Sequence, residues 1–462
     1  MKRRQFHLNS LIDASALLRL THHFANEEGT CLLYSGSFYE TAQRSFLFLF
    51  PYEFIKIHGG VYQRWKSNRQ PFFVQDANPW EALRRLGPDI GQGNSSFPEW
   101  VGFFSYEMGA YSDRDVVVPH QSAATPEAYW QRCAVTLMVD HSAGRAVVQL
   151  VDLEDESLND DVREWLHRLG SEEGWQELLK KKDPKRTKKQ PLIFDSISDT
   201  QQSYLKKIEI AKEFIRSGDV YQINLSQQWE FSGYRDPFDL FAQLASLNPA
   251  PFSAYLYLKD FCIVSSSPER FLQKKGDFLE TRPIKGTAPR GRSLMEDAAN
   301  KCDLQASEKE RAELIMITDL MRNDLGKLSV NKSVEVPLLC GCEAYHNVFH
   351  LFSIIRSRVL PIIDCLEIVR MCFPGGSITG CPKLRAMELI DELEQRPRGI
   401  YTGSMGYFAE NGDFDLNIAI RTLILTGRKV NIQLGGGIVI DSEPQKEYEE
   451  IYHKGRSIFE IL

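Results

Sequence analysis

Lys285 is the residue of this sequence whose type and setting point most directly to covalent chemistry. It stands in residues 282–287 (RPIKGT), between a proline that fixes the entering backbone and a glycine that lets the chain approach a ligand closely. A desolvated amine held in such a turn can attack carbon as a nucleophile. A lysine in a Pro/Gly turn is more often a solvated surface charge, so the rest of the sequence has to decide between the two interpretations.

Glutamates three residues apart are a second candidate for chemistry. Glu310 and Glu313 share one face of a predicted helix, because the apolar run at residues 314–317 should press that helix into the core. Ser307 and Glu310 also have the form of a capping box, which gives Glu310 a structural alternative.

The same spacing recurs near the C-terminus, where a helix is predicted to begin near Ser442 and Pro444 and to carry Glu447 and Glu450. Facing carboxylates repel one another unless a cation joins them. Mg2+ prefers a few carboxylates together with waters and an anionic ligand oxygen, so two such helix faces could form a magnesium site. The spacing alone favours two exposed acidic surfaces.

Two further charged residues adjoin predicted strands. Glu269 follows Pro268 at the end of a strand, where its carboxyl could point into a cleft or pair with Arg270 in a turn. Arg421 is polar within an otherwise apolar predicted strand at residues 418–425, and a buried charge needs a partner. An internal acid would serve, but a guanidinium also suits the carboxylate of a ligand.

Composition and motifs disfavour several classes of function. The formal net charge of -7 does not suit binding to nucleic acid, which calls for a basic face. No segment has the apolar length of a membrane span. The glycine run at residues 435–437 lacks the Gly-Lys-Ser/Thr ending of a phosphate loop, so a turn at the end of a strand is a better interpretation than a nucleotide site. The cysteines lack the paired spacings of zinc sites or disulfides, which predicts reduced thiols and a cytoplasmic location.

The order of predicted elements indicates an α+β protein. Residues 1–175 hold short apolar runs broken by Gly, Pro and Asn, which predict strands; residues 176–194 form a basic linker; residues 195–462 carry the candidate residues. In this last region the spacing of apolar residues predicts a helix at residues 204–217 ended by Gly218, helices around Glu313 and Glu388, and buried strands at residues 256–265 and 418–425.

Six motifs, in order along the second half of the chain, resemble those of the chorismate-utilising enzyme family, which includes the anthranilate synthases. They are residues 265–271 (SSSPERF), 283–287 (PIKGT), 311–313 (RAE), 322–326 (RNDLG), 373–380 (FPGGSITG) and 435–439 (GGGIV). Several motifs in the same order are far more specific than any single one. The resemblance implies the fold of anthranilate synthase component I, in which two β-sheets pack face to face with helices on the outside and both halves of the chain form one body.

The resemblance also assigns roles to individual residues. It implies that Glu313 and Glu450 bind Mg2+, with Glu310 and Glu447 nearby, and that the metal holds a carboxylate of chorismate. It implies that Glu269 is the general acid that protonates the departing C4 hydroxyl, a role that requires a raised pKa. The remaining positions that it places against the substrate are Gly286, Thr287, His350, Tyr401, Arg421, Gly435, Gly436 and Gly437. A lone histidine such as His350 is as often structural.

Two positions discriminate among the reactions of this family. Gln222 stands where the water-using members carry a lysine base, and a neutral amide cannot activate water, so ammonia is the expected nucleophile. Lys285 stands where anthranilate synthases usually have alanine. On the mechanism proposed for the family, the lysine attacks ring C2 and ammonia then adds at C4. The resemblance therefore implies formation of 4-amino-4-deoxychorismate, on the way to p-aminobenzoate and folate.

Other interpretations remain open. An anthranilate synthase component I with an incidental lysine is the first, and a silent, ligand-binding relative that regulates a partner is the second. The chain lacks the Gly-x-Cys-x-Gly nucleophile elbow of a glutamine amidotransferase, so a separate glutaminase subunit is expected to supply ammonia. Residues 248–252 (NPAPF) resemble the part of the family that can hold tryptophan, or form a Pro-rich turn; residues 32–35 (LLYS) match the accompanying motif only loosely, which argues against feedback by tryptophan.

Overall fold

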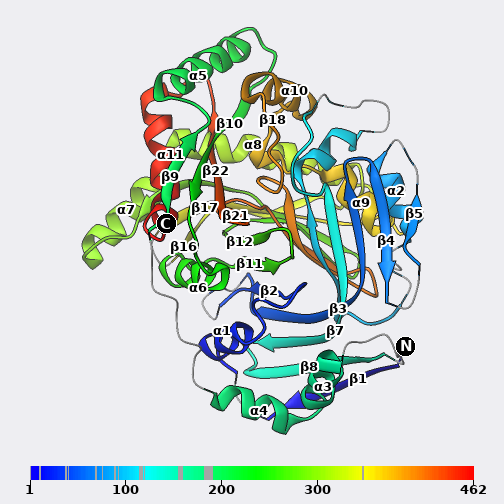
Figure 1. The fold of residues 1–462 in the computed structure, drawn as a ribbon. Helices are drawn as coiled ribbons and strands as arrows, with labels where there is room; N and C mark the ends of the chain where they lie inside the picture. Colours follow the sequence, from blue (N-terminus) through cyan, green and yellow to red (C-terminus); the bar gives the residue numbers. More distant parts are fainter. Residues whose placement is uncertain are drawn as a thin grey trace.

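The structure is a computed structural model in which strands of the N-terminal and C-terminal regions alternate within the same sheets (Figure 1). It describes residues 2–462 except 10, 11, 37, 38, 40, 68, 69, 75, 77, 88, 89, 92, 114–117, 119, 154–159, 182–190, 346 and 347. The central part of the predicted basic linker, residues 182–190, lies outside the described residues.

The first sheet is antiparallel and contains the strands that later carry most of the site. Its order is β1 (Lys2–Leu8), β8 (Arg145–Asp152), β7 (Ala128–Asp140), β3 (Arg44–His58), β2 (Cys31–Tyr34), β11 (Phe252–Tyr257), β12 (Cys262–Ser267), β21 (Thr422–Thr426), β22 (Lys429–Ile438) and β10 (Gln222–Ser232), and β10 also pairs with β9 (Ile193–Ile197) and β18 (Gly380–Cys381).

The second sheet is also antiparallel and shares two long strands with the first. Its order is β5 (Phe72–Val74), β4 (Val61–Lys66), β3, β7, β6 (Pro98–Phe104), β19 (Ser404–Ala409), β20 (Phe414–Asn417), β13 (Arg270–Lys275), β14 (Phe278–Arg282) and β17 (Val348–Arg358), and β17 also pairs with β15 (Ile284–Pro289) and β16 (Glu335–Ala344). Strands β3 and β7 contribute one half of their length to each sheet, and the register between them shifts at Pro51 and Glu53. Such an irregularity lets a strand bend from one sheet into the other.

Alternating side chains show that the two sheets face one another. Phe46 and Phe48 of β3 belong to one buried cluster with residues of β2, β11, β12, β6 and β19, whereas Leu47 and Leu49 belong to a different cluster. The ring of Phe46 in the first sheet lies 5.1 Å from that of Tyr407 in the second. Because successive side chains of a strand point to opposite faces, the first cluster fills the space between the sheets. The predicted α+β class and packing of the sheets are confirmed.

Helices cover the outer faces, as predicted. They are α1 (Ala14–His22), α2 (Pro79–Leu86), α3 (Asp160–Leu169), α4 (Glu172–Lys180), α5 (Gln201–Arg216), α6 (Pro237–Leu247), α7 (Leu294–Ala306), α8 (Glu308–Gly326), α9 (Cys365–Cys372), α10 (Lys383–Glu394) and α11 (Pro444–Phe459), with short 3-10 turns η1 (Tyr106–Tyr111) and η2 (Gly376–Ile378). Figure 1 shows α1, α3 and α4 at one end and α5 and α10 at the other. In the described part of the chain, none of the helices is both long and apolar enough to cross a membrane.

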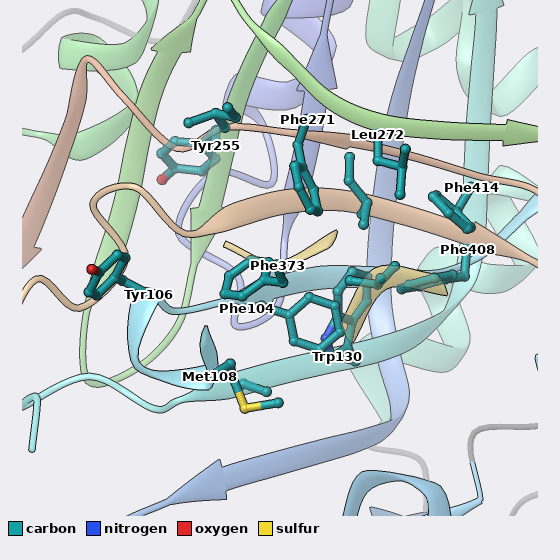
Figure 2. Close-up of a cluster of buried hydrophobic side chains, with 14 of the residues drawn as sticks. Phe104, Tyr106, Met108, Trp130, Tyr255, Phe271, Leu272, Phe373, Phe408 and Phe414 are labelled. Carbon is teal, nitrogen blue, oxygen red and sulfur yellow. The ribbon is translucent and has the colours of Figure 1, made fainter. Parts of the chain in front are cut away.

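An aromatic cluster fixes the second sheet against its covering helices (Figure 2). The ring of Trp130 lies 4.8 Å from those of Phe104 and Phe408, and Phe373, which caps the C-terminus of α9, packs edge-on against Phe104. Trp80 of α2 lies 5.0 Å from the same Phe104 ring. Buried aromatic contacts of this kind hold the sheet rigid under the residues that follow α9 in the sequence.

Two predicted strands were wrong in their extent. Residues 256–265 are not one strand, because the chain turns between β11 and β12, where the Leu258 amide donates to the Phe261 carbonyl. The second error concerns residues 418–425, since β21 begins only at Thr422 and residues 418–421 connect it to β20. The helices at residues 204–217 and around Glu313 and Glu388 are confirmed as α5, α8 and α10.

Candidate active site

Glu269 lies directly after β12, where the sequence analysis places it, and its side chain is buried. Burial raises the pKa of its carboxyl to about 7, although a hydrogen bond from Ser377 Oγ (2.6 Å to Oε1) and the nearby charge of Lys285 lower it in part. Arg270 does not pair with Glu269 but with Glu280 and Asp415. A substantial share of Glu269 is therefore protonated near pH 7, as a general acid requires.

Lys285 lies on β15, with its amine against the glycine run of β22. A Cβ atom at Gly437 would lie 2.9 Å from Lys285 Nζ and 3.1 Å from Gln222 Nε2, so these two polar groups meet over Gly437. Within the described residues Lys285 has no hydrogen bond or ion pair, although it lowers the pKa of Glu269. The Lys285 side chain is half-buried, so its amine does not lie on an open surface.

Gln222 is fully buried at the start of β10. Neither its Oε1 nor its Nε2 has a hydrogen-bond partner among the residues that the structure describes. Buried polar atoms are normally satisfied, so an unpartnered carboxamide beside Lys285 indicates a place for a polar ligand.

The glycines at 435–437 were predicted to form a turn at a strand end if they had no function, and that prediction is wrong. They lie inside β22, paired with Ser226, Leu225 and Asn224 of β10. The ladder of hydrogen bonds continues through this stretch, and the missing side chains leave room on both faces of the strand. Gly435 faces the Tyr401 hydroxyl, and Gly436 faces Glu447 Oε2 and Lys454 Nζ on the opposite side.

Replacement of Gly437 by alanine should therefore lower turnover of the substrate by tenfold or more while the protein stays folded. The new methyl group would displace Lys285 Nζ and Gln222 Nε2, and both are the far ends of flexible side chains that can move. An error of about 1 Å in placing reacting groups can cost on the order of 100-fold in rate. Steady-state kinetics and thermal unfolding of the variant check this, with Gly326→Ala at the end of α8 as the control, because a Cβ atom there meets nothing within 4 Å; unchanged kinetics would contradict it.

His350 lies on β17 and is buried. Its Nδ1 lies 3.2 Å from Thr287 Oγ1 and 3.3 Å from the Gly286 carbonyl, which ties it to the segment that carries Lys285. Burial lowers the pKa of His350 to about 3, so its ring is neutral. Its Nε2 has no partner within the described ranges, which leaves this nitrogen available to a ligand.

Arg421 differs from its prediction, because it lies in the connection before β21 and has a left-handed backbone (φ 51°). Its half-buried side chain forms no ion pair with the residues that are described, and Glu269, Tyr39 and Tyr345 are near enough to influence it. Desolvation lowers the pKa of Arg421. Because no acid among the described residues forms an ion pair with Arg421, the second interpretation, a ligand carboxylate, is the better one.

Tyr401 is buried beside Gly435, where a Cβ atom would lie 2.8 Å from its hydroxyl. The guanidinium of Arg398 lies 5.8 Å from the centre of its ring. Burial raises the pKa of Tyr401, so its hydroxyl stays protonated and can donate a hydrogen bond.

The two glutamate pairs do face one another across α8 and α11. Lys309 Nζ lies 3.9 Å from Glu313 Oε1 and 3.7 Å from Glu447 Oε1, so one cation already lies between the helices. Burial raises the pKa of Glu310, Glu313 and Glu447.

Glu450 lies at the exposed edge of this acidic cluster, where Lys454 pairs with it at 2.7 Å and lowers its pKa. Glu310 Oε2 would lie 3.0 Å from a Cβ atom at Gly286, so the cluster adjoins the segment that carries Lys285. Among the described residues, no three of these four glutamates bring ligand oxygens within 4.8 Å of one another, so a divalent cation there would have to draw the carboxylates together.

The sequence analysis gave no role to Ser377, although it lies in one of the quoted motifs. Its hydroxyl donates to Glu269 and its neighbour Ile378 accepts from Arg398 (3.0 Å). A hydroxyl residue within an apolar, glycine-rich motif was the available signal, but nothing in the sequence shows which acid Ser377 contacts.

A cavity of about 860 Å3 lies away from these residues, between the two sheets. Ser35, Pro251 and Phe252 line it, so the two segments that were compared with a tryptophan site do border one space. Lys285, Gln222 and Glu269 do not line this cavity.

Comparison with known proteins places the chain in a family. Residues 43–460 match the family described as chorismate binding enzyme. Aminodeoxychorismate synthase component 1 of Bacillus subtilis is 37% identical over 78% of this chain and 77% of its own length. Anthranilate synthase component 1 of Lactococcus lactis is 33% identical over 84% of this chain and 85% of its own. The chain belongs to the chorismate binding enzyme family.

The solved structure of anthranilate synthase component I from Streptococcus pneumoniae has the same fold. It superposes with a TM-score of 0.76, at 31% identity, over 90% of this chain and 92% of that one. The family match and the fold therefore define an enzyme that acts on chorismate.

Proposed function

We propose that this enzyme aminates chorismate at C4 with ammonia and forms 4-amino-4-deoxychorismate, on the way to p-aminobenzoate and folate. One observation carries this proposal. Lys285 Nζ and the Gln222 carboxamide both lie next to the Cβ position of Gly437, and the carboxamide has no hydrogen-bond partner among the described residues. A lysine there offers a nucleophile, and a neutral amide offers no base to deprotonate water. Ammonia needs no such deprotonation.

The amination would take place in two successive substitutions on the ring of chorismate. The Lys285 amine forms a bond to ring C2, the conjugated double bonds shift, and the C4 hydroxyl leaves as water with the proton of Glu269. Ammonia then forms a bond to C4, the double bonds shift back, and the bond from C2 to lysine breaks. Arg421 is proposed to bind a carboxylate of chorismate, and Tyr401 and His350 to donate to or accept from its oxygens.

We propose further that Glu313 and Glu450 bind Mg2+, with Glu310 and Glu447 close by. The carboxylates of α8 and α11 offer the oxygen ligands that Mg2+ prefers, and the Lys309 ammonium lies 3.9 Å from Glu313 and 3.7 Å from Glu447. When bound, Mg2+ would neutralise a substrate carboxylate and fix its position.

Glu313→Gln should raise the Mg2+ concentration needed for half-maximal turnover by about 10- to 100-fold, a range typical of changes around metal sites. Isothermal titration of Mg2+ into the protein gives a second readout that does not depend on turnover. Glu308→Gln, an exposed glutamate on the first turn of the same helix, is the matched control. Equal Mg2+ dependence of the two variants would argue against the site.

Ammonia is proposed to come from a separate glutamine amidotransferase subunit. Relatives in Bacillus subtilis and Escherichia coli carry the name component 1, which implies a second component in those organisms. A cytoplasmic location for such an assembly also remains a prediction.

Anthranilate formation is the competing function, because an anthranilate synthase component 1 is among the relatives. Mass-resolved analysis of the product from chorismate, Mg2+ and a high ammonium concentration separates the two. Aminodeoxychorismate, converted to p-aminobenzoate only when a suitable lyase is added, supports the proposal. Anthranilate and pyruvate would refute it, and no turnover would support a silent, ligand-binding relative.

A further inference from the structure

Asn224 is a buried residue of β10 to which the mechanism above gives no role. Its Oδ1 has no hydrogen-bond partner among the described residues, and the same holds for both amide atoms of Gln222, two residues earlier. Both side chains point to the same face of the strand, because successive side chains alternate. Three unsatisfied polar atoms thus lie on one short stretch of strand.

The register of β10 and β22 shows what lies beside Asn224. It pairs directly with Gly437, and residues that pair directly across an antiparallel ladder present their side chains on the same face. Because Gly437 has no side chain, the space that its Cβ atom would take next to the Asn224 carboxamide is left to polar groups. Lys285 Nζ and Gln222 Nε2 border that space, at 2.9 Å and 3.1 Å from the position of a Cβ atom at Gly437.

The backbone of Asn224 is firmly held, so its side chain is the part left for a ligand. Its amide donates to the Thr379 carbonyl at 2.7 Å, and its carbonyl accepts from Arg398 Nη2 at 2.8 Å. Arg398 is itself buried and paired with Glu394. A residue whose backbone is fixed by hydrogen bonds and whose side-chain oxygen has no partner among the described residues is typical of a binding residue.

We infer that Asn224 and Gln222 form the pocket that binds ammonia beside Lys285, and this inference rests on the proposed amination. Ammonia has three N–H donors and one lone pair. The carboxamide oxygen of Asn224 accepts an N–H group, and the Gln222 side chain borders the same space, which leaves the lone pair of ammonia free to face the substrate. When the nitrogen bonds to C4, the bond from C2 to Lys285 breaks, and the departing lysine amine takes the surplus proton from the new ammonium group.

The test uses Asn224→Leu, which has a similar shape without the acceptor, and Asn224→Asp, which keeps an oxygen. Loss of one hydrogen bond to a small ligand corresponds to about a 3- to 10-fold weaker interaction. The KM for ammonium at saturating chorismate should therefore rise by that factor in Asn224→Leu. The KM for chorismate should stay within twofold, and Asn224→Asp should largely restore the KM for ammonium.

Asn431→Leu is the matched control, since this asparagine lies on the neighbouring strand and accepts from Gln228 instead. Circular dichroism and thermal unfolding establish that each variant folds, and Asn224→Ala replaces the leucine variant if that one does not. An unchanged KM for ammonium, or an equal rise in both KM values, would overturn the pocket while leaving the amination intact. A wild-type enzyme that forms no aminated product would overturn both.

Discussion

Lys285→Ala is expected to lower the formation of 4-amino-4-deoxychorismate by on the order of 10³-fold, because it removes the nucleophile that divides the substitution into two steps. Lys285 lies against Gly437 and Gln222, close enough to Glu269 to influence its pKa, so no second amine is expected to replace it in the same position. Rapid-quench kinetics with mass-resolved products measure the loss. A shift of the product toward anthranilate would agree with the same interpretation.

Two controls separate the nucleophile from the positive charge. Lys285→Arg keeps the charge but cannot act as a comparable nucleophile, so it should be as inactive as the alanine variant. Lys429→Ala, which removes an exposed lysine paired with Glu230, should leave the rate unchanged. Intact-protein mass spectrometry of the wild type with chorismate in the absence of ammonia should reveal an adduct of chorismate minus water. An active arginine variant would contradict the covalent role.

Glu269→Gln is expected to lower kcat by about 10²- to 10⁴-fold, the range typical of a lost general acid. The pKa of Glu269, raised to about 7 by burial, sets the pH dependence. Only the protonated form can donate to the leaving hydroxyl, so kcat/KM of the wild type should fall as the pH rises above about 7. A pH profile of kcat/KM checks this, and an activity that keeps rising to pH 9 would exclude Glu269 as the acid.

Ser377→Ala offers a matched test of the same assignment. The hydrogen bond from Ser377 Oγ lowers the pKa of Glu269, so its removal should move the fall in activity to higher pH. The direction of this shift distinguishes an effect on the acid from a general loss of structure, which would lower activity at every pH.

The raised pKa of Glu269 should also make the stability of the folded protein depend on pH. Between about pH 4.5 and pH 7 the folded state keeps the proton of Glu269 while the unfolded state has lost it, so this group makes the protein less stable as the pH rises through that range. Glu269→Gln removes the penalty. Its unfolding temperature should exceed that of the wild type at pH 8, and the difference should shrink at pH 4.

The sequence by itself determined the residues that carry chemistry and the local elements around them. The spacing of apolar residues defined α5, α8 and α10, because helical periodicity depends only on neighbours three and four positions apart. The ordered motifs around Glu269, Lys285 and Gly437 indicated the family, since residue types in sequence order need no three-dimensional information.

Only the tertiary structure decided the features that depend on pairing between strands far apart in the sequence. Arg421 has the apolar neighbours of a strand residue, but residues 418–421 cross between two sheets and its backbone is left-handed. The glycines at 435–437 have the composition of a turn, yet hydrogen bonds to β10, some 200 residues earlier, keep them extended. The position of the buried Asn224 side chain beside Gly437 depends on that same register. Local patterns cannot reveal such contacts, because strand partners far apart in sequence are selected only when the whole fold packs.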